Sequence, residues 1–502
     1  MAISTTDATI GVVYLIMIVL LGVWVGRDQK DLSGYLLGNR DLPWWAILGS
    51  IVATETSTAT FLSVPGIAFA AHGDMTFLQL ALGFILGRII VAVVMVPLYF
   101  RGRLFTAYEV LEHRFGGATK RAASVMFLIT RNLGDGLRLF LAGLALEKVL
   151  GADLYICVIV IGIATIIYTF LGGMKAVIWS DCIQFVIYMA GGIIALKILI
   201  DSLPGGWNEL VAYGEATQKF RVFDSGVDSD GRFRILTDPY TIWSGVIGGA
   251  VLTLGTHGTD QLFVQRYLSA RNQRDASLAV ITSGFVVFLQ FALFLLLGVA
   301  LACFYSSVYP QTFDHNDEVF ATFIVDHLPV GLTGITLAAV FAAAMSTLSS
   351  SLNSSAAAAV ADFYRPWLAK RSGGKKEPDS RQLLSASRKM TIVFGVIQIA
   401  VGIGASHISR SVVGDALAIA GFSAGILLGV FALGVLTRFA HQRGVFVGFL
   451  TGIAVLAWIK FGTDVAWPWY AVIGAITTFS IGAIASRLVS PKSPESETRE
   501  HS

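Results

Sequence analysis

Residues 50–60 read SIVATETSTAT, and they interrupt the second long apolar segment of a 502-residue chain. Six of these eleven residues carry a hydroxyl group, and one is Glu55. Threonine is a weak helix former, and hydroxyl side chains can take over backbone hydrogen bonds. We therefore expect this helix to unwind inside the membrane. Because unpaired backbone groups are tolerated at that depth only where they line a cavity, the unwound residues should line one. Packing of hydroxyl groups between neighbouring helices is the simpler alternative.

The composition of the whole chain places this stretch in a bilayer. Hydrophobic residues make up 55%, the mean hydropathy is +0.71, and 14% of residues are charged, against roughly 25% in a soluble domain. Three scattered cysteines exclude a disulfide scaffold, and a net charge of +3 is too small to indicate a nucleic-acid partner. We predict an all-α, multi-pass protein of a cell membrane of the bacterial inner-membrane type, functional as a monomer.

A transmembrane helix needs about 20 mostly apolar residues. This length predicts thirteen spans, at residues 8–26, 44–70, 76–99, 122–149, 153–171, 176–201, 241–267, 276–305, 331–363, 385–405, 413–438, 443–461 and 467–488. With the N-terminus outside, 25 of the 36 lysines and arginines fall on inner segments and 7 on outer ones, so the positive-inside rule predicts N-out, C-in. We expect the outer segment 202–240 to form a small cap and the basic segment 365–384 to be a flexible cytoplasmic connector.

A second polar interruption lies at residues 255–261, which read GTHGTDQ. Two glycines flank His257, so this helix should break as well. Broken helices at corresponding points of two halves are typical of inverted-repeat transporters with a site at the membrane midplane. The chain then divides into a leading helix (8–26), a first five-helix repeat (44–201), a second repeat (241–438), two trailing helices (443–488) and a cytoplasmic tail (489–502).

A third polar stretch, at residues 343–354, has small and hydroxyl residues on one broad helical face. These are Ala343, Ser346, Thr347, Ser349, Ser350 and Asn353. Neutral oxygens in a row suit a hard monovalent cation, whereas a seam of small residues for close helix packing is an equally good interpretation.

Ionisable residues inside other spans are candidates for function, because a charge at that depth is costly. Asp181 is one of them. It should either bind a cation or form a structural ion pair with Lys175 or a nearby arginine. Arg131, Asp135 and Arg138 share one face of a long span, where they form either an ion network or the polar wall of a solute path.

Four stretches in order resemble the sodium:solute symporter family over nearly the whole chain. They are residues 172–184 (GGMKAVIWSDCIQ), 343–354 (AAMSTLSSSLNS), 260–267 (DQLFVQRY) and 60–66 (TFLSVPG). The resemblance implies a LeuT-type fold, in which two inverted five-helix repeats are joined by one leading and two trailing helices.

The resemblance also implies sites for one or two sodium ions and a solute. The main sodium site would use the carbonyls of Ala53, Thr56 and Ala343 with the hydroxyls of Ser346 and Thr347. A second sodium site would use Asp181 with Ser346, Ser349 and Ser350. The solute site would include Glu55, Ser57, Thr60, Phe77, Gln79, Asp135, His257 and Asp260.

The chain departs from each named branch of the family. The arginine and glutamine of the sialic-acid branch align with Gly134 and Ala81, and Arg131 and Arg138 are out of register with that arginine. The proline branch has aspartate at the position of Glu55, and the glucose-type branch shares Asp260-Gln261 but lacks that acid.

We expect sodium-coupled symport of a small polar solute, with a sugar or sugar acid favoured because residues 54–60 are rich in hydroxyls. An amino acid or small carboxylate is the alternative solute. A sodium-binding sensor on the same fold is the alternative of a different class, although only a short polar tail follows Val489. No metal cluster, nucleotide loop or Ser-His-Asp arrangement predicts an enzyme.

Overall fold

The computed structural model describes residues 4–28, 31–102, 104–228, 230–313, 315–372, 379–405 and 412–488. Within these ranges the chain is helical, with two isolated bridges, Leu42 to Ala270 and Val227 to Phe233. Nine described helices are long and apolar enough to cross a membrane, or ten if the bent pair at 44–69 counts as one span. The count of thirteen and the orientation stay predictions.

The longer helices are, in chain order, α1 (Thr5–Val25), α3 (Trp44–Glu55), α4 (Thr58–Phe69), α5 (Leu78–Ile90), α8 (Gly117–Leu150), α9 (Leu154–Ser202), α10 (Gly206–Ala216), α11 (Gly249–Thr259), α13 (Gln273–Ser307), α15 (Leu332–Ala358), α17 (Ser380–Ala405), α18 (Val412–Leu436), α19 (Gln442–Gly462) and α20 (Pro468–Leu488). The shorter ones are α2 (Leu32–Leu37), α6 (Val96–Tyr99), α7 (Glu109–Phe115), α12 (Gln261–Leu268), α14 (Val319–Asp326), α16 (Arg365–Arg371), η1 (Gly26–Asp28), η2 (Gly38–Arg40), η3 (Val91–Met95), η4 (Ser244–Gly248), η5 (Asn316–Glu318) and η6 (Ala359–Tyr364).

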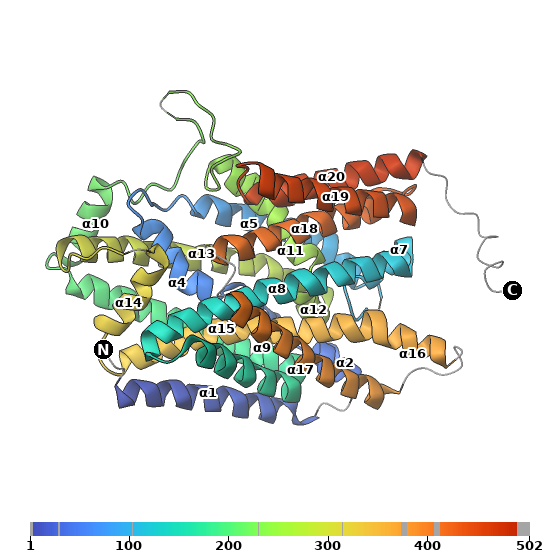
Figure 1. The fold of residues 1–502 in the computed structure, drawn as a ribbon, viewed down its shortest axis with the longest axis horizontal. Coiled ribbons are helices and arrows are strands. Elements are labelled where there is room, and N and C mark those ends of the chain that lie inside the picture. Colours follow the sequence, from blue (N-terminus) through green and yellow to red (C-terminus); the bar gives the residue numbers. More distant parts are fainter. Residues whose placement is uncertain are drawn as a thin grey trace.

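The long helices run roughly along the longest axis of the molecule (Figure 1). Helices α10 and α14 lie at one end and α7 and α16 at the other. Helix α1 begins at the α10 end, whereas α20 ends at the α16 end. Nearly every residue of α15 is buried, because its run of alanines and serines lets several helices approach its backbone closely. Helix α15 is therefore the centre against which the sites are built.

The polar stretch 50–60 contains the expected interruption. Helix α3 ends at Glu55 and α4 begins at Thr58, while the backbone of Thr56 and Ser57 is not helical (ψ 87° and 172°). The two halves are bent by 60° relative to each other. The hydroxyl side chains and the freed carbonyls at the bend account for this break.

The second interruption lies at Asp260, within the predicted stretch 255–261 and two residues after its second glycine. Gly255, His257 and Gly258 are helical, and α11 ends only at Thr259. Asp260 takes an extended conformation (ψ 126°), and its Oδ1 accepts a hydrogen bond from the Leu262 amide at 2.9 Å. An aspartate that caps the following helix decides the position of the break, because glycine permits a break without requiring one.

Helix α9 covers both expected spans at 153–171 and 176–201, and it kinks sharply at Gly173 (φ 53°, ψ −154°). Only glycine adopts these angles readily. Next to the kink, a Cβ atom on Gly26 would lie 2.5 Å from the Gly172 Cα. The missing side chain thus lets the end of α1 touch α9.

The two connecting segments differ in how well the sequence predicted them. Residues 202–240 contain α10 and a loop that projects from one corner of the molecule (Figure 1). The prediction of a flexible connector at 365–384 is wrong for its described parts, since residues 365–371 form α16 and α17 begins at Ser380. Arg371 stacks over the Trp367 ring at 5.3 Å, which stabilises this turn of helix. Residues 373–378 lie outside the described ranges.

Candidate functional site

The end of α3 lies against the middle of α15, where backbone carbonyls meet hydroxyl groups. Ser346 Oγ donates to the Ala53 carbonyl at 2.8 Å and lies 3.3 Å from the Ala343 carbonyl. Thr347 Oγ1 donates to the Thr54 carbonyl at 3.0 Å. All these residues are buried. Three of the five residues expected at the main sodium site therefore converge, and Thr347 lies beside them. A hydroxyl that now donates to a carbonyl can instead turn a lone pair toward a cation.

The Thr56 side chain belongs to a neighbouring cluster. Its Oγ1 donates to the Val52 carbonyl at 2.9 Å, and it accepts from Gln290 at 2.7 Å and from the Tyr188 hydroxyl at 3.1 Å. These contacts hold the residue at the bend in place from α13 and α9. The expected sodium ligand at this position is the carbonyl, so the side-chain contacts leave that proposal untested.

Asp181 is fully buried and lies in an ion pair with Arg266 of α12, at 3.2 Å. Its Oδ2 also accepts from Ser50 at 2.5 Å and lies 3.5 Å from Ser350 Oγ. Its Oδ1 is buried without a hydrogen-bond partner among the described residues. Ser349 Oγ donates to the Ser346 carbonyl at 3.1 Å, within α15.

The structure thus contains the arginine pair that the sequence left as an alternative for Asp181. Lys175 does not supply it, because Lys175 pairs with Asp41 at 3.1 Å. Arg266 also donates to the hydroxyls of Thr54 and Ser350. The guanidinium therefore connects the end of α3, α9 and α15.

A cavity of about 370 Å³ lies beside the α3–α4 bend and extends toward the α14 end of the molecule. Five residues of the expected solute site line it, namely Glu55, Ser57, Thr60, Phe77 and His257. Three others lie outside its lining. Gln79 donates to the Tyr240 carbonyl at 2.6 Å, and Asp135 and Asp260 are held in ion pairs with arginines.

Ion pairs surround the middle of this cavity. Arg88 pairs with Glu55 and donates to Ser283 at 2.9 Å. His257 Nε2 lies 3.8 Å from Glu55 Oε2, and the imidazole stacks on Phe263 at 4.0 Å. Because Arg88 neutralises Glu55, this carboxylate is not available as an unpaired charge for a solute amine.

A second network joins α8 to the break between α11 and α12. Arg131 pairs with Asp260 and lies 3.6 Å from Asp135. Arg138 donates to Asp135 at 2.6 Å. Asp135 is fully buried, whereas Arg138 keeps 21% of its side chain exposed and lines the cavity together with Arg131. The two arginines therefore present donors to the cavity while their carboxylate partners lie behind them.

Sequence reasoning gave no role to several residues that form the site. Arg88 lies inside a span, where a charged side chain is energetically costly. This position was the signal that could have identified it as a site residue. Tyr240, Phe291 and Asp317 also line the cavity, but aromatic and loop residues of this kind carry no comparable signal. Asp317 also lines a polar vestibule of about 550 Å³ at the α14 end.

Known proteins resemble this chain over nearly its full length. The sodium/sialic acid symporter NanT of Aliivibrio fischeri is 29% identical over 480 residues, which are 94% of this chain and 91% of that protein. The human sodium/iodide cotransporter is 28% identical over 89% of this chain and 68% of its own length. A solved structure of a Na+-coupled sialic acid symporter, substrate-bound and outward-open, matches with a TM-score of 0.85 and 28% identity, over 97% of this chain and 99% of that one.

The architecture described above is therefore the LeuT-like fold of that symporter. The model of the sodium:solute symporter family matches residues 35–452, which include both broken helices, the Asp181 cluster and all of α15. The resemblance seen in the four sequence stretches is confirmed. The chain belongs to the sodium:solute symporter family.

Proposed function

We propose that this protein couples the inward movement of sodium to the uptake of a small organic anion that carries hydroxyl groups, such as a sugar acid. Two arginines and several hydroxyl groups in one cavity are the observation that supports this solute class. Arg131 and Arg138 of α8 supply charged donors, and Ser57, Thr60 and Ser63, at the start of α4 and within it, supply hydroxyls. Guanidinium groups bind carboxylates through paired hydrogen bonds.

The charge balance of the site also favours an anion. Three arginines, Arg88, Arg131 and Arg138, stand against three carboxylates, Glu55, Asp135 and Asp260. The middle of the site is thus close to neutral before sodium binds. One or two sodium ions make it positive, and a solute carboxylate then restores neutrality. The names of the relatives agree, since sialic acid and iodide are both anionic.

The main sodium ion would bind between the α3–α4 bend and α15, to the oxygens of Ala53, Thr56, Ala343, Ser346 and Thr347. Neutral oxygens are sufficient for a monovalent cation, whose charge the solute anion balances nearby. A second ion would bind Asp181 with Ser346, Ser349 and Ser350, through the Oδ1 that has no partner among the described residues. Arg266 would then hold Oδ2 while the ion takes Oδ1.

The two interrupted helices would be equivalent elements of inverted repeats at 44–201 and 241–438, flanked by helices 8–26 and 443–488. The cavity and the vestibule share Ile67, Tyr240 and Asp317, so these three residues lie between the solute site and the vestibule at the α14 end. If that end faces outward, as the N-out, C-in prediction requires, solute would enter through the vestibule and pass these residues. We place the protein in a bacterial-type inner membrane, as a monomer.

Uptake into proteoliposomes tests the proposal. Matched acidic and neutral solutes, such as glucuronate and glucose, together with sialic acid, an amino acid and a monocarboxylate, are offered with sodium or choline outside. We expect sodium-dependent uptake of the acidic sugar and little uptake of its neutral partner. Preference for glucose or for a zwitterion would contradict the solute class, and solute binding without any uptake would favour a sensor.

The Arg138→Gln variant tests the residue assignment. Loss of a charge-assisted hydrogen bond should raise the KM for the acidic solute about tenfold or more, and Arg138→Lys should recover part of the affinity. Lys197→Gln is a matched control, because Lys197 is exposed and pairs with Asp201 of the same helix. An equal rise in KM in this control would show that Arg138 does not bind the solute.

A further inference from the structure

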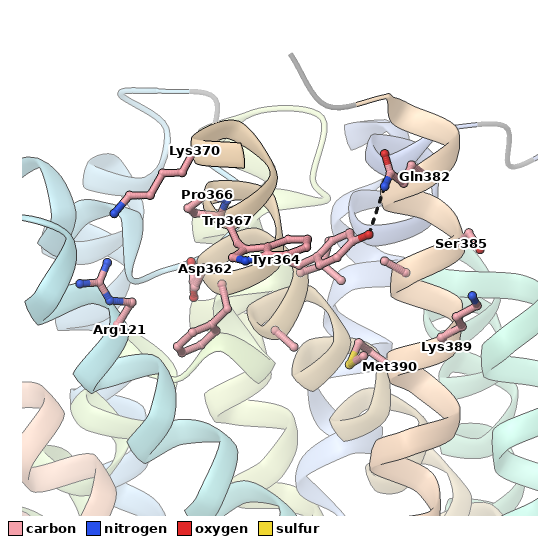
Figure 2. Close-up of a pocket in the computed structure, with 14 residues that line it drawn as sticks. Arg121, Asp362, Tyr364, Pro366, Trp367, Lys370, Gln382, Ser385, Lys389 and Met390 are labelled. Carbon is pink, nitrogen blue, oxygen red and sulfur yellow. Dashed lines mark hydrogen bonds between the residues drawn. The ribbon is translucent and has the colours of Figure 1, made fainter. Parts of the chain in front are cut away.

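A separate pocket of about 940 Å³ lies where α15 continues through η6 into α16, at the end of the molecule opposite α10 and α14. Its walls come from the first turns of α8, from η6 and α16, and from the first turns of α17. Figure 2 shows Arg121 of α8 and Lys370 of α16 on one side, and Gln382, Ser385 and Lys389 of α17 on the other. None of these residues belongs to the sodium or solute sites, and the volume lies within the range of roughly 300–1,000 Å³ usual for ligand sites.

The rim of this pocket is strongly basic. Among the described residues, Arg121, Lys370 and Lys389 have no carboxylate within 4.0 Å, in contrast to the paired charges of the solute cavity. Arg371 stacks on Trp367, and Arg365 lies 5.5 Å from the Phe105 ring, so two further cations lie on the same short helix. A basic pocket between helices at the cytoplasmic surface suits an anionic headgroup.

The deeper walls of the pocket are apolar. They consist of Ala359, Val360, Phe363, Ala386 and Met390. Trp367 is half exposed at the rim, as expected of an aromatic residue at the membrane interface. Tyr364 accepts a hydrogen bond from Gln382 at 3.3 Å and thereby joins the two sides of the pocket (Figure 2). A ligand with a charged head and an apolar chain fits such walls better than a fully hydrated ion.

The pocket also contains a buried carboxylate that can accept a further hydrogen bond. Asp362 is 1% exposed, and its Oδ1 accepts from Thr106 at 2.8 Å. Its Oδ2 is buried without a hydrogen-bond partner among the described residues. A buried acceptor of this kind calls for a donor, so the headgroup that enters should carry hydroxyl groups as well as a phosphate.

We propose that this pocket binds an anionic phospholipid of the phosphatidylglycerol class. Its phosphate would lie between Arg121 and Lys370, which are on the same side of the pocket (Figure 2), its headgroup hydroxyls would donate to Asp362, and an acyl chain would follow Phe363 and Met390. Three cations against one carboxylate favour this headgroup over the zwitterionic phosphatidylethanolamine. The bound lipid would connect the α16 end of α15 to α17 and α8. The proposal is independent of which solute the protein carries.

Native mass spectrometry of the delipidated full-length protein tests the proposal, with phosphatidylglycerol, phosphatidylethanolamine and phosphatidylmethanol added in turn. Phosphatidylmethanol has the same charge as phosphatidylglycerol but no headgroup hydroxyls. We expect phosphatidylglycerol to be retained best. Equal retention of phosphatidylethanolamine would overturn the charge assignment. A millimolar excess of soluble glycerol phosphate should not displace the lipid, and displacement would assign the pocket to a free anion.

Variants locate the binding within the pocket. Arg121→Gln and Lys370→Gln should each weaken retention about fivefold, and Lys370→Arg should preserve it. Arg274→Gln is the matched control, because Arg274 is an exposed arginine at the start of α13, outside the pocket. An equal loss in Arg274→Gln would show a non-specific surface effect and overturn the site.

The Asp362→Leu variant, which removes both acceptor oxygens at similar size, tests the role of the carboxylate. It should abolish the preference for phosphatidylglycerol over phosphatidylmethanol while leaving the retention of phosphatidylmethanol unchanged. A preference that persists in this variant would overturn the contact between Asp362 and the headgroup. Size-exclusion elution of each variant verifies that it is folded before lipid is added.

Discussion

The two interrupted helices differ in what their breaks present to the interior. The α3–α4 break presents carbonyls and neutral hydroxyls to α15, and its one acid, Glu55, is neutralised by Arg88. The α11–α12 break presents Asp260, which caps α12 and pairs with Arg131. A neutral oxygen cluster suits a cation, whereas a carboxylate tied to an arginine adjusts the charge of the solute cavity. Under the proposed function the two breaks have separate roles: the first would bind sodium and contribute hydroxyls to the solute cavity, whereas the second would set the charge of that cavity.

The strongest test of this separation is the double variant Ser346→Ala/Thr347→Ala. It removes two oxygens that face the first break. Contacts between a neutral oxygen and a charged group contribute about 1.5–3 kcal/mol each, so the sodium concentration for half-maximal uptake should rise about a hundredfold or more. Solute affinity should fall only through linkage to sodium.

Ser354→Ala is the matched control for that variant, since Ser354 lies on the same helix and its Oγ donates within that helix, to the Ser351 carbonyl at 3.1 Å. Sodium-dependent uptake at fixed solute measures both. Unchanged sodium dependence in the double variant would show that α15 does not contribute to the sodium site. The proposed contrast between the two breaks would then be wrong.

The sequence predicted the first break better than the second, for a physical reason. A run of six hydroxyl residues is itself the cause of the bend at Thr56 and Ser57, so local sequence was sufficient. The second break lies within the predicted stretch 255–261, but its glycines do not mark the position, because the deciding event is the capping of α12 by Asp260. Both are local effects, but only the first has a composition that stands out.

The charge partners could not be predicted from the sequence. Arg88 and Glu55 are separated by 33 residues, and Arg266 and Asp181 by 85. Such pairs depend on which helix faces touch, and helix packing is not encoded in the periodicity of any one span. The sequence did identify Asp181, Arg131 and Arg138 as costly charges that need partners. It left open which partners they have.

The second test asks whether Asp181 binds a second sodium ion next to the first break. If Asp181 binds a second sodium ion, Asp181→Asn should lower the Hill coefficient for sodium toward one. For a monoanionic solute the cycle would then carry no net charge, so uptake would lose its response to membrane potential. One charge crossing 100 mV is worth about 2.3 kcal/mol, so the loss in accumulation is roughly fiftyfold.

Because this variant leaves Arg266 buried without its partner, instability must be separated from a lost ion. Removing one member of a buried pair typically costs about 3–5 kcal/mol. The double variant Asp181→Asn/Arg266→Gln restores the charge balance and keeps polar groups at both positions. Thermal unfolding and voltage-dependent uptake are measured for both. Full voltage dependence in a stable double variant would show that Asp181 is only a structural acid.

The third test examines the second break. Asp260→Asn keeps an oxygen that can cap α12 but removes a negative charge next to Arg131. The cavity becomes more positive, so the KM for an acidic solute should fall about fivefold, equivalent to roughly 1 kcal/mol. The KM for a neutral solute and the binding of sodium without solute should stay unchanged. Asp201→Asn, at an exposed acid, is the control. A rise in sodium affinity without solute would show that the two breaks share one charge site.

The smallest expected effect concerns how the two broken helices are held at the α14 end. The α4 half of the first is capped by Lys219, whose ammonium group donates to the Ala68 and Ala70 carbonyls, both at 2.8 Å. The segment that leads into the second is held by Asp224, which accepts from the Gly226 amide at 2.7 Å and pairs with Arg234 at 3.1 Å. One attachment depends on a lysine, which stays protonated in acid, and the other depends on a carboxylate.

Acid should therefore loosen the second attachment and not the first. Burial raises the pKa of Asp224, but the Gly226 amide and the Arg234 guanidinium outweigh it and hold the pKa below its usual value. A carboxyl group with a lowered pKa stabilises the folded segment at neutral pH, and this contribution disappears as the pH falls below about 4. Hydrogen exchange, corrected for its intrinsic pH dependence, should then show residues 224–245 opening more easily by about 1 kcal/mol, while residues 62–70 stay protected. Asp224→Asn should show a looser segment already at pH 7, with a smaller further change in acid, because Asp228 and Asp238 also pair with Arg234. Equal loosening of both segments would mean that a single electrostatic network holds both helices, and the contrast between the two breaks would not extend to this end of the molecule.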